Sequence, residues 1–329
     1  MAKNDEVCVA GATIAEILRL LGSGATGEIL LALGAGPART KELVERVPGY
    51  TPRSIYRYTG KLADLEIIER NVEKGPPSKV THTLTDSCGQ ELLELVERFA
   101  DASLERLPDG RIDPVDWAGL NLLADMWETA MIDALSCEPV SPGDLGRGHP
   151  DLSYHQVARR ARLFQAAGLI AEAGEPGGRQ LALTEKARRA MALVIGIGRW
   201  RHHHVIAEDE EGMTAAEMAT VLRTALPLAS VGEHQGKSLR MDVRPAEGDA
   251  GQEFSVWAEI QQEGVFTCVA PIESVDGWAA GRVSDWIPAL LDADRSQLEI
   301  GGREDVAPAC IEQLHEILWR RPAPDLVSA

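Results

Sequence analysis

Residues 40–65, TKELVERVPGYTPRSIYRYTGKLADL, decide the fold of the first part of this chain. Pro48 and Gly49 force a tight turn in the middle of this stretch. Thr51 and Pro52 then mark the start of a helix, because threonine caps helices and proline suits the first helical position. The pattern predicts one short helix, a tight turn and a second helix.

The segments around this stretch extend it in a regular order. Thr40 is predicted to cap the first helix of the pair, and Thr85 to cap a later, long helix. Two helices come before the pair, and two strands and the long helix come after it, at residues 13–21, 27–33, 67–72, 80–84 and 90–104. This order is typical of a winged helix-turn-helix, in which the helix after the turn enters the DNA major groove.

The whole pattern occurs twice. Residues 27–68 align without a gap on residues 129–170, which lie 102 positions later, and Leu84-Thr85 then matches Leu183-Thr184 after three residues drop out. The identical pairs are Ala32/Ala134, Leu33/Leu135, Pro37/Pro139, Leu43/Leu145, Pro48/Pro150, Arg57/Arg159 and Ile68/Ile170. A match without gaps through caps, prolines and core positions predicts two copies of one small domain.

The second copy has its own start and stop signals. Ser153 is predicted to cap its recognition helix, and a shorter wing lies between its two strands. The predicted helices and strands of this copy cover residues 127–135, 142–146, 154–167, 169–173, 179–183 and 185–200.

Both copies resemble the HxlR-type family of winged-helix transcriptional regulators, relatives of the MarR group. The matching segments are residues 37–43, 48–53 and 84–86 in the first copy, and 150–153, 167–170 and 183–185 in the second. The second copy departs from the pattern at residues 138–141 and in its shorter wing. The resemblance implies DNA binding, and since family members bind as homodimers, two fused copies imply an internal pseudo-dimer that reads two unlike half-sites about one helical turn apart.

Cationic and polar side chains on the two recognition helices and wings are the predicted DNA contacts. They suit phosphate positioning, and arginine also grips a guanine edge. The set is Arg53, Ser54, Arg57, Lys61, Lys74, Lys79, His155, Gln156, Arg159, Arg160, Arg162 and Arg179. The alternative is ordinary surface charge on a solvated helix. Three nearby tyrosines remain open between core packing, stacking on sugars and an interface: Tyr56, Tyr58 and Tyr154.

Charge divides the chain into three predicted domains. Residues 1–107, 108–206 and 207–329 carry net charges of −3, −1 and −14, out of −18 for the chain. Within the two copies, residues 39–79 and 145–204 are net basic, at +3 and +6, and such local faces bind a polyanion because salt screens distant charge. The first two domains are therefore the expected DNA readers, and the acidic third domain is of a different kind.

The sequence of the third domain predicts a β-sheet with helices. Five strands are expected at residues 237–244, 253–261, 265–272, 276–283 and 297–301, and three helices at 213–226, from Ser284 onward, and 306–319. This order, with residues 284–291 and 298–302, resembles the sterol carrier protein type 2-like fold, which implies a hydrophobic ligand tunnel. Gly302 stands where that family often has an acidic residue. The overall prediction is a multidomain α+β protein: two tandem winged helix-turn-helix domains and a C-terminal α/β sterol-carrier-like domain.

Large aromatic side chains of the third domain are the predicted ligand contacts, since ligand pockets are mostly apolar. They are Trp257, Phe266, Trp278 and Trp286, and the alternative is that they are ordinary core residues. Strand alternation separates Trp257 from the apolar face of its strand, which makes it the more interesting of the set.

Other chemistry is not expected. The sequence holds no phosphate loop, nucleophile elbow or HExxH motif, so neither an enzyme nor a cofactor is predicted. Adjacent helical side chains point about 100° apart, so His202, His203 and His204 cannot all ligate one ion and are interpreted as a basic helix end. Cys8 lies where many HxlR-type proteins carry a sensing cysteine, with an ordinary thiol as the alternative.

The hypothesis is a cytoplasmic transcriptional regulator. No apolar run reaches about 18 residues, no signal-peptide pattern is seen, and the five scattered cysteines fit reduced thiols. Its expected partners are double-stranded DNA and a hydrophobic small-molecule effector, with no membrane, and the protein is a monomer or homodimer. The alternatives are a ligand-sequestering or resistance protein that does not bind DNA, and a regulator that docks other proteins on its winged helices.

Overall fold

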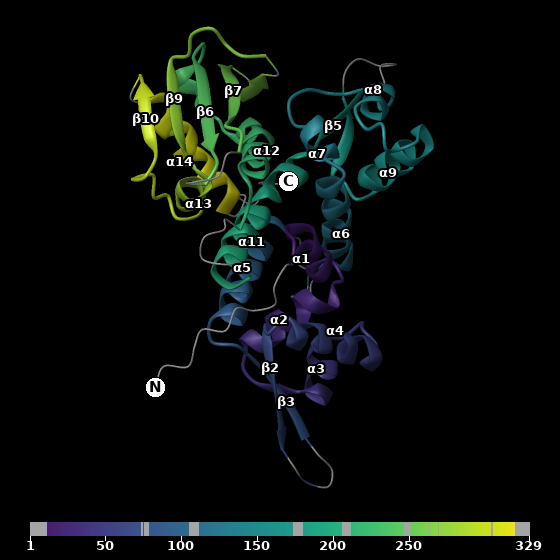
Figure 1. Ribbon diagram of the computed structural model, residues 1–329. Coiled ribbons are helices and arrows are strands. Elements are labelled where there is room, and N and C mark those ends of the chain that lie inside the picture. Colours follow the sequence, from purple (N-terminus) through teal and green to yellow (C-terminus); the bar gives the residue numbers. More distant parts are fainter. Residues whose placement is uncertain are drawn as a thin grey trace, which may run out of the picture. The chain divides into compact units, whose positions relative to one another are not determined.

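The chain forms two compact units (Figure 1). The first is drawn from Met1–Asn121 and Ile197–Gly212, and the second from Leu122–Gly196 and Met213–Ala329. The structure, a computed structural model, describes residues 12–73, 75, 79–104, 112–173, 180–205, 212–246, 251–262, 264–268, 270–303 and 305–319. Two helices, α6 (Pro114–Glu128) and α11 (Met191–His204), contribute residues to both units.

The first unit contains the predicted helix-turn-helix and wing. Its helices are α1 (Ile14–Leu21), α2 (Ala25–Gly34), α3 (Thr40–Arg46), α4 (Pro52–Asp64) and α5 (Cys88–Ser103). Its sheet has the order β1-β3-β2, with strands β1 (Ala38–Arg39), β2 (Ile68–Glu73) and β3 (Lys79–Leu84), all antiparallel. Figure 1 shows β2 and β3 as the long hairpin that extends from this unit.

The helix ends of the first unit follow local capping chemistry, with two corrections. Thr51 caps α4 as predicted, and Thr13, expected as the first residue of a helix, is the N-cap of α1. The N-cap of α5 is Ser87 and not Thr85, although the Thr85 hydroxyl accepts from the N–H of Gly89 at 2.8 Å. Thr40 does not cap α3: Arg39, held extended in β1, precedes the helix, and the Thr40 hydroxyl lies 2.9 Å from Nε2 of buried His82 instead. The tertiary contact with β3 therefore overrides the capping signal.

The second unit begins with a shorter set of helices and a hairpin. The elements are α7 (Met131–Ala134), α8 (Pro142–Arg147), α9 (Tyr154–Ala166), β4 (Ile170–Ala173), β5 (Gln180–Leu183) and α10 (Glu185–Arg189). Two predicted helices are wrong as single elements. The helix over 127–135 breaks at Ala130, which has a φ of 53°, and the helix over 185–200 breaks at Ala190 between α10 and α11.

One backbone contact recurs in both units at equivalent positions. In the first unit Ala38 pairs with His82, and in the second Val140 forms an isolated antiparallel bridge with Leu181. Val140 lies 102 positions after Ala38, and Leu181 lies 99 positions after His82, which are the two offsets of the sequence repeat. The segment at 138–141, where the sequence pattern departs, thus keeps this backbone contact.

The rest of the second unit is a five-stranded sheet with helices. The strands β6 (Ser238–Arg244), β7 (Phe254–Gln261), β8 (Gly264–Cys268), β9 (Gly277–Arg282) and β10 (Glu299–Gly302) have the order β10-β9-β6-β7-β8. Neighbours are antiparallel except β6 and β9, which are parallel. The helical elements are α12 (Ala215–Ala225), η1 (Leu226–Leu228), η2 (Gly232–His234), α13 (Val283–Leu291) and α14 (Val306–Trp319).

The predicted sheet is confirmed, with shifted ends. The strand expected to reach residue 272 ends at Cys268, ahead of Pro271, which has no N–H for a ladder. The helix expected to be capped by Ser284 begins one residue earlier, at Val283. Arg282 is its N-cap, and the N–H of Arg282 donates to the carboxylate of Asp285 at 2.8 Å.

Gly302 has a structural reason to be glycine. Its φ is +81°, and a Cβ there would lie 2.4 Å from the carbonyl oxygen of Asp276. An acidic residue at this position would therefore be strained and would collide with the backbone.

Apolar side chains of β6 and α12 are buried in the core of the sheet region. Leu239, Met241 and Val243 of β6 are buried, as are Met218 and Leu222 of α12, which packs on β6 and β7.

Among the described residues no single helix is long and apolar enough to cross a membrane. Helices α1 and α2, which are bent by 79° relative to each other, pass the test of length and composition as a pair.

Candidate nucleic-acid interface

Helix α4 presents a basic row on one face. Arg53, Arg57 and Lys61 are exposed and follow one another at a spacing of four residues, so their side chains lie along one side of the helix. Arg57 and Lys61 flank the ring of half-buried Tyr58, with the guanidinium carbon and the ammonium nitrogen 5.4 and 5.7 Å from its centre. Cation–π contact of this kind holds long side chains in place on a helix surface.

The opposite face of α4 anchors it in the first unit. Ile55, Thr59 and Leu62 are buried, and the hydroxyl of Thr59 donates to the carbonyl of Ile55 at 2.9 Å. Side chains at three- and four-residue spacing bury one stripe, which leaves the basic row free to face a ligand. Helix α4 is therefore a rigid support for the cations rather than a loosely attached helix.

The remaining predicted residues of this half divide into three groups. Ser54 belongs to the helix cap: its N–H donates to the Thr51 hydroxyl at 3.2 Å, and the two hydroxyls lie 3.0 Å apart. Lys79 is exposed at the start of β3, opposite Glu73. Lys74 lies outside the described residues. Tyr56 is 62% exposed, which places it on the surface beside the basic row and not in the core.

Helix α9 in the second unit has a different surface. His155, Arg159 and Arg162 are exposed, Tyr154 is 60% exposed, and the rings of Tyr154 and His155 meet edge to face at 6.0 Å. Leu163, which occupies the position of Lys61, is 44% exposed. This surface is a mixture of aromatic, apolar and cationic groups and not a row of one charge.

Two predicted contacts on α9 already have partners. The side-chain carbonyl of Gln156 accepts from the Ser153 N–H at 2.7 Å and closes a capping box. Arg160 is half-buried and donates from Nε to the carboxylate of Asp125 at 2.9 Å. Gln156 and Arg160 therefore have structural roles, and the exposed cationic side chains of α9 are Arg159 and Arg162. Arg179 lies outside the described residues.

Comparison with known proteins identifies the region that contains α3 and α4. The model of the HxlR-like helix-turn-helix family matches residues 20–108, which contain α3, α4 and the wing. The chain belongs to the HxlR-like helix-turn-helix family. Over 88 residues it is 33% identical to the HTH-type transcriptional regulator YodB of Bacillus subtilis (strain 168), an alignment that covers 26% of this chain and 79% of that relative. No solved structure matches the chain.

The HxlR-like region contains two supporting residues that the sequence did not single out. Arg46 reaches back from α3 to the carbonyls of Ala32 and Gly36, at 3.3 and 3.4 Å, and so satisfies groups at the end of α2. His82 is buried, bonded at Nε2 to Thr40, and its Nδ1 has no hydrogen-bond partner among the described residues. Burial first, and then the charge of Arg70, lower the pKa of His82, so the ring is neutral in the fold.

Beyond the HxlR-like region, the sheet brings three of the four predicted ligand contacts together. Trp278, Arg240 and Trp257 stand side by side on β9, β6 and β7, and the guanidinium carbon of Arg240 lies 5.5 Å from the centre of the Trp257 ring. Trp278 lies over Gly301, and Phe266 of β8 is 42% exposed on this same face by strand alternation. We call these four side chains, Arg240, Trp257, Phe266 and Trp278, the aromatic face.

Trp286 does not belong to the aromatic face. It is fully buried on α13, and its indole N–H donates to the backbone carbonyl of Asp242 at 3.1 Å. That satisfied hydrogen bond and complete burial describe a core tryptophan. Next to the aromatic face, the carboxylate of Asp242 forms an ion pair with Arg240 at 2.9 Å from Nε and accepts from the Ser255 hydroxyl at 2.7 Å. The ion pair holds the arginine beside Trp257.

Proposed function

We propose that the protein is a ligand-responsive, DNA-binding transcriptional regulator whose principal DNA reader is helix α4. The observation that carries this is the row of Arg53, Arg57 and Lys61 on the exposed face of the helix that follows the turn. A basic helix in this position supplies phosphate contacts along the major groove and can read guanine with arginine. The family match over residues 20–108, which contain α4, and the 33% identity to a transcriptional regulator support the proposal.

We further propose that residues 129–183 form a second winged helix-turn-helix. The gap-free repeat supports it, as do the capped helix α9, the hairpin β4-β5 and the Val140–Leu181 bridge that repeats the Ala38–His82 pair. The two copies would then read two unlike half-sites as an internal pseudo-dimer. Since α9 has fewer exposed cations than α4, we expect its half-site to contribute less to affinity.

The C-terminal sheet region is the proposed effector domain, of sterol-carrier-like fold. The aromatic face supports a flat, hydrophobic effector, because indole rings and a fixed guanidinium stack well on planar groups. Burial first, and then the charge of Glu259, raise the pKa of the Cys268 thiol beside Trp257, which keeps this face free of a thiolate.

Contacts within the second unit give the effector a physical route to the second repeat. Arg223 of α12 pairs with Asp133, and Arg188 of α10 donates to the carbonyl of Thr224 at 2.8 Å. Thr267 of β8 donates to the carbonyl of Ser136 at 3.3 Å. A ligand changes DNA affinity only if it binds one arrangement of these contacts more tightly than another. A coupling free energy of about 1–3 kcal/mol between ligand binding and DNA binding is typical of such switches.

Gel-shift titration on the DNA upstream of the protein's own coding region tests DNA reading. We expect a specific shift with micromolar protein that an Arg53→Ala/Arg57→Ala variant loses. Arg303→Ala, which removes an exposed cation of the sheet region, is the matched control and should bind like wild type. Absence of any shift for wild type at roughly 100 mM salt would contradict the proposal.

Ligand binding is tested separately by mass spectrometry of small molecules that copurify with the full chain. Trp257→Ala and Trp278→Ala should each release the bound compound, and adding it to ligand-free protein should change the gel-shift midpoint. A bound compound with no DNA binding would favour the alternative, a ligand-sequestering protein that uses the winged helix as scaffold.

A further inference from the structure

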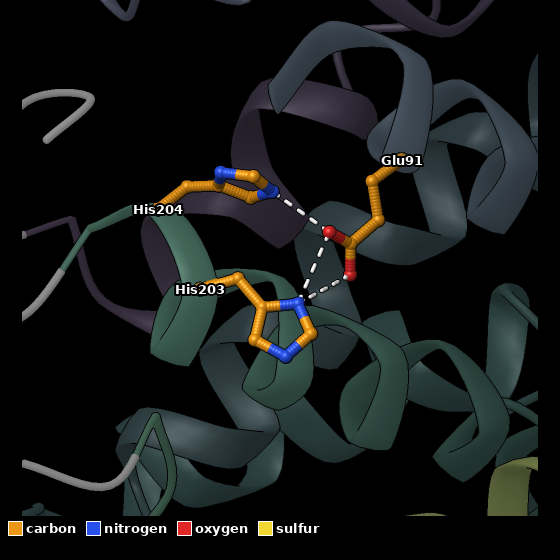
Figure 2. Close-up of side chains that lie close together, drawn as sticks. All are labelled: Glu91, His203 and His204. Atoms are coloured by element: carbon orange, nitrogen blue, oxygen red, sulfur yellow. Dashed lines mark hydrogen bonds and ion pairs between the residues drawn. The ribbon is translucent and has the colours of Figure 1, made fainter. Parts of the chain in front are cut away.

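Three side chains from two helices meet at one point of the first unit. Glu91 lies in the first turn of α5, and His203 and His204 lie at the end of α11, 112 and 113 residues later in the chain. Nε2 of His204 is 2.7 Å from one carboxylate oxygen of Glu91, and Nδ1 of His203 is 3.1 and 3.2 Å from the two oxygens (Figure 2). We call these three residues the His-Glu cluster.

Helix geometry excludes a metal site made of His202, His203 and His204 together, but it allows the His-Glu cluster. Adjacent helical side chains diverge by about 100°, so three in a row cannot meet at one ion. Two neighbours can still reach one group, and Figure 2 shows the rings of His203 and His204 both facing the Glu91 carboxylate. His202 is not part of the cluster. The sequence interpretation of a basic helix end missed the carboxylate, because α5 is distant in the chain.

Contacts outside the cluster hold its two helices in place. The indole N–H of buried Trp200 on α11 donates to the backbone carbonyl of Cys88, the first residue of α5, at 2.8 Å. One residue later, Nε of Arg201 donates to the carbonyl of Ala12 at 2.7 Å. The three potential ligand atoms therefore lie within 4.8 Å of one another on a support that does not depend on them.

The donor set selects a class of ion. Two imidazole nitrogens and one carboxylate oxygen suit zinc and related divalent transition metals, while magnesium and calcium prefer oxygen ligands alone. With bonds of about 2.0–2.2 Å, tetrahedral donors lie roughly 3.4 Å apart. The nitrogen–oxygen separations of 2.7 to 3.2 Å are roughly 0.2–0.7 Å shorter than this, so side-chain rotations that move the rings away from the carboxylate admit an ion. The His203 side chain is 47% exposed, which leaves room for water as a fourth ligand.

One neighbouring cation opposes metal binding. Nε of Arg199 lies 3.6 Å from a carboxylate oxygen of Glu91, one helical turn before His203. Arg199 must turn away when an ion enters, and its charge weakens the affinity.

We propose that Glu91, His203 and His204 bind one divalent transition-metal ion of the zinc class, with one coordination position left to water. The ion replaces the shared hydrogen bonds and joins the end of α11 to α5. A ligand that binds only the folded state adds stability by mass action, so this ion also stabilises the first unit. This site is separate from α4 and from the aromatic face.

Calorimetric titration of the metal-stripped, reduced full chain with Zn²⁺ tests the proposal. We expect one equivalent to bind, and Glu91→Gln or His204→Gln to weaken binding by more than about 100-fold, since even supporting residues of metal sites cost about 10–100-fold. His202→Gln, on the same helix but outside the cluster, is the matched control and should bind as wild type. Circular dichroism of each variant checks that the fold is kept.

Two further measurements separate the cluster from the five cysteines and from a simple ion-pair network. Bound Co²⁺ should show ligand-field bands of nitrogen and oxygen ligation without thiolate charge-transfer absorption. Arg199→Gln should tighten Zn²⁺ binding, because it removes the opposing charge. Equal Zn²⁺ binding by wild type and Glu91→Gln, thiolate absorption with Co²⁺, or binding abolished by cysteine-to-serine changes alone would each overturn the proposal.

Discussion

Helices α4 and α9 occupy equivalent positions in the repeat, yet only their buried faces are alike. Ile55 and Leu62 correspond to Val157 and Phe164, and all four are fully buried. On the outer face, Arg53 and Lys61 of α4 are replaced by His155 and Leu163. The inner face is constrained by packing, where loss of volume is costly, while the outer face is free to change with its ligand.

The two helices also differ in how their polar side chains are used. On α9, Gln156 and Arg160 are bonded to Ser153 and Asp125. Among the described residues, the basic row on α4 has no such hydrogen-bond or ion-pair partner, and only the ring of Tyr58 lies against it. A cation paired with a carboxylate has less to offer a phosphate. The comparison supports the proposal that α4 is the principal DNA reader.

The largest expected effect is a loss of stability when a side chain on the buried face of α4 or α9 is truncated. Phe164→Ala should destabilise the second unit by about 3–5 kcal/mol, and Leu62→Ala the first by about 2–5 kcal/mol, because each leaves a cavity in a packed core. Urea unfolding followed by circular dichroism measures this, with exposed Leu163→Ala as the control. A cost near that of the control would show that the helix is not anchored as described.

The next effect is a loss of DNA affinity when a cationic side chain on the outer face of α4 or α9 is removed. Arg53→Ala and Arg57→Ala should each weaken operator binding by about 1–3 kcal/mol, since each removes a base or phosphate contact. Arg159→Ala in α9, the counterpart of Arg57→Ala, should cost less. Fluorescence anisotropy at fixed salt measures all three. Equal losses in the two helices would break the asymmetry and make both copies full readers.

A smaller effect distinguishes paired from free cations within α9. Arg160→Ala should lower the stability of the second unit by about 1 kcal/mol, because it breaks the half-buried pair with Asp125. It should leave operator affinity close to wild type, while the exposed neighbour Arg162→Ala should reduce affinity and leave stability unchanged. The reverse pattern would place Arg160 on DNA.

The smallest effect is a pH dependence confined to the first unit. His82 has a lowered pKa in the fold, so the unfolded chain binds more protons below about pH 6.5, and stability falls as the pH drops through that range. The equivalent residue of the second copy is Leu181, which does not titrate. In Thr40→Val/His82→Leu, which replaces both bonded partners, thermal unfolding of the first unit should lose this slope. A slope that persists in the variant would assign it to another group.

Much of the secondary structure follows from the sequence alone. Turn residues, helix caps and alternation place α4, α9 and the five strands within a few residues, because these signals act between near neighbours. The misplaced ends have tertiary causes: Thr40 turns to His82, and Ala130 adopts a left-handed backbone that splits a predicted helix. The exposed row of Arg53, Arg57 and Lys61 was also predictable, since helical spacing alone places it on one face.

What only the tertiary structure decided is the set of contacts between distant segments. Sequence alternation placed Trp257 away from the apolar face, but strand order and register were needed to bring Arg240 and Trp278 beside it and to separate Trp286. The three adjacent histidines were visible in the chain, whereas Glu91 joins two of them only because α11 packs on α5. The sequence by itself determined local elements, the repeat and the HxlR-like region, because these depend on spacing of a few residues. Sites built from residues more than a hundred positions apart depend on packing, which no local pattern records.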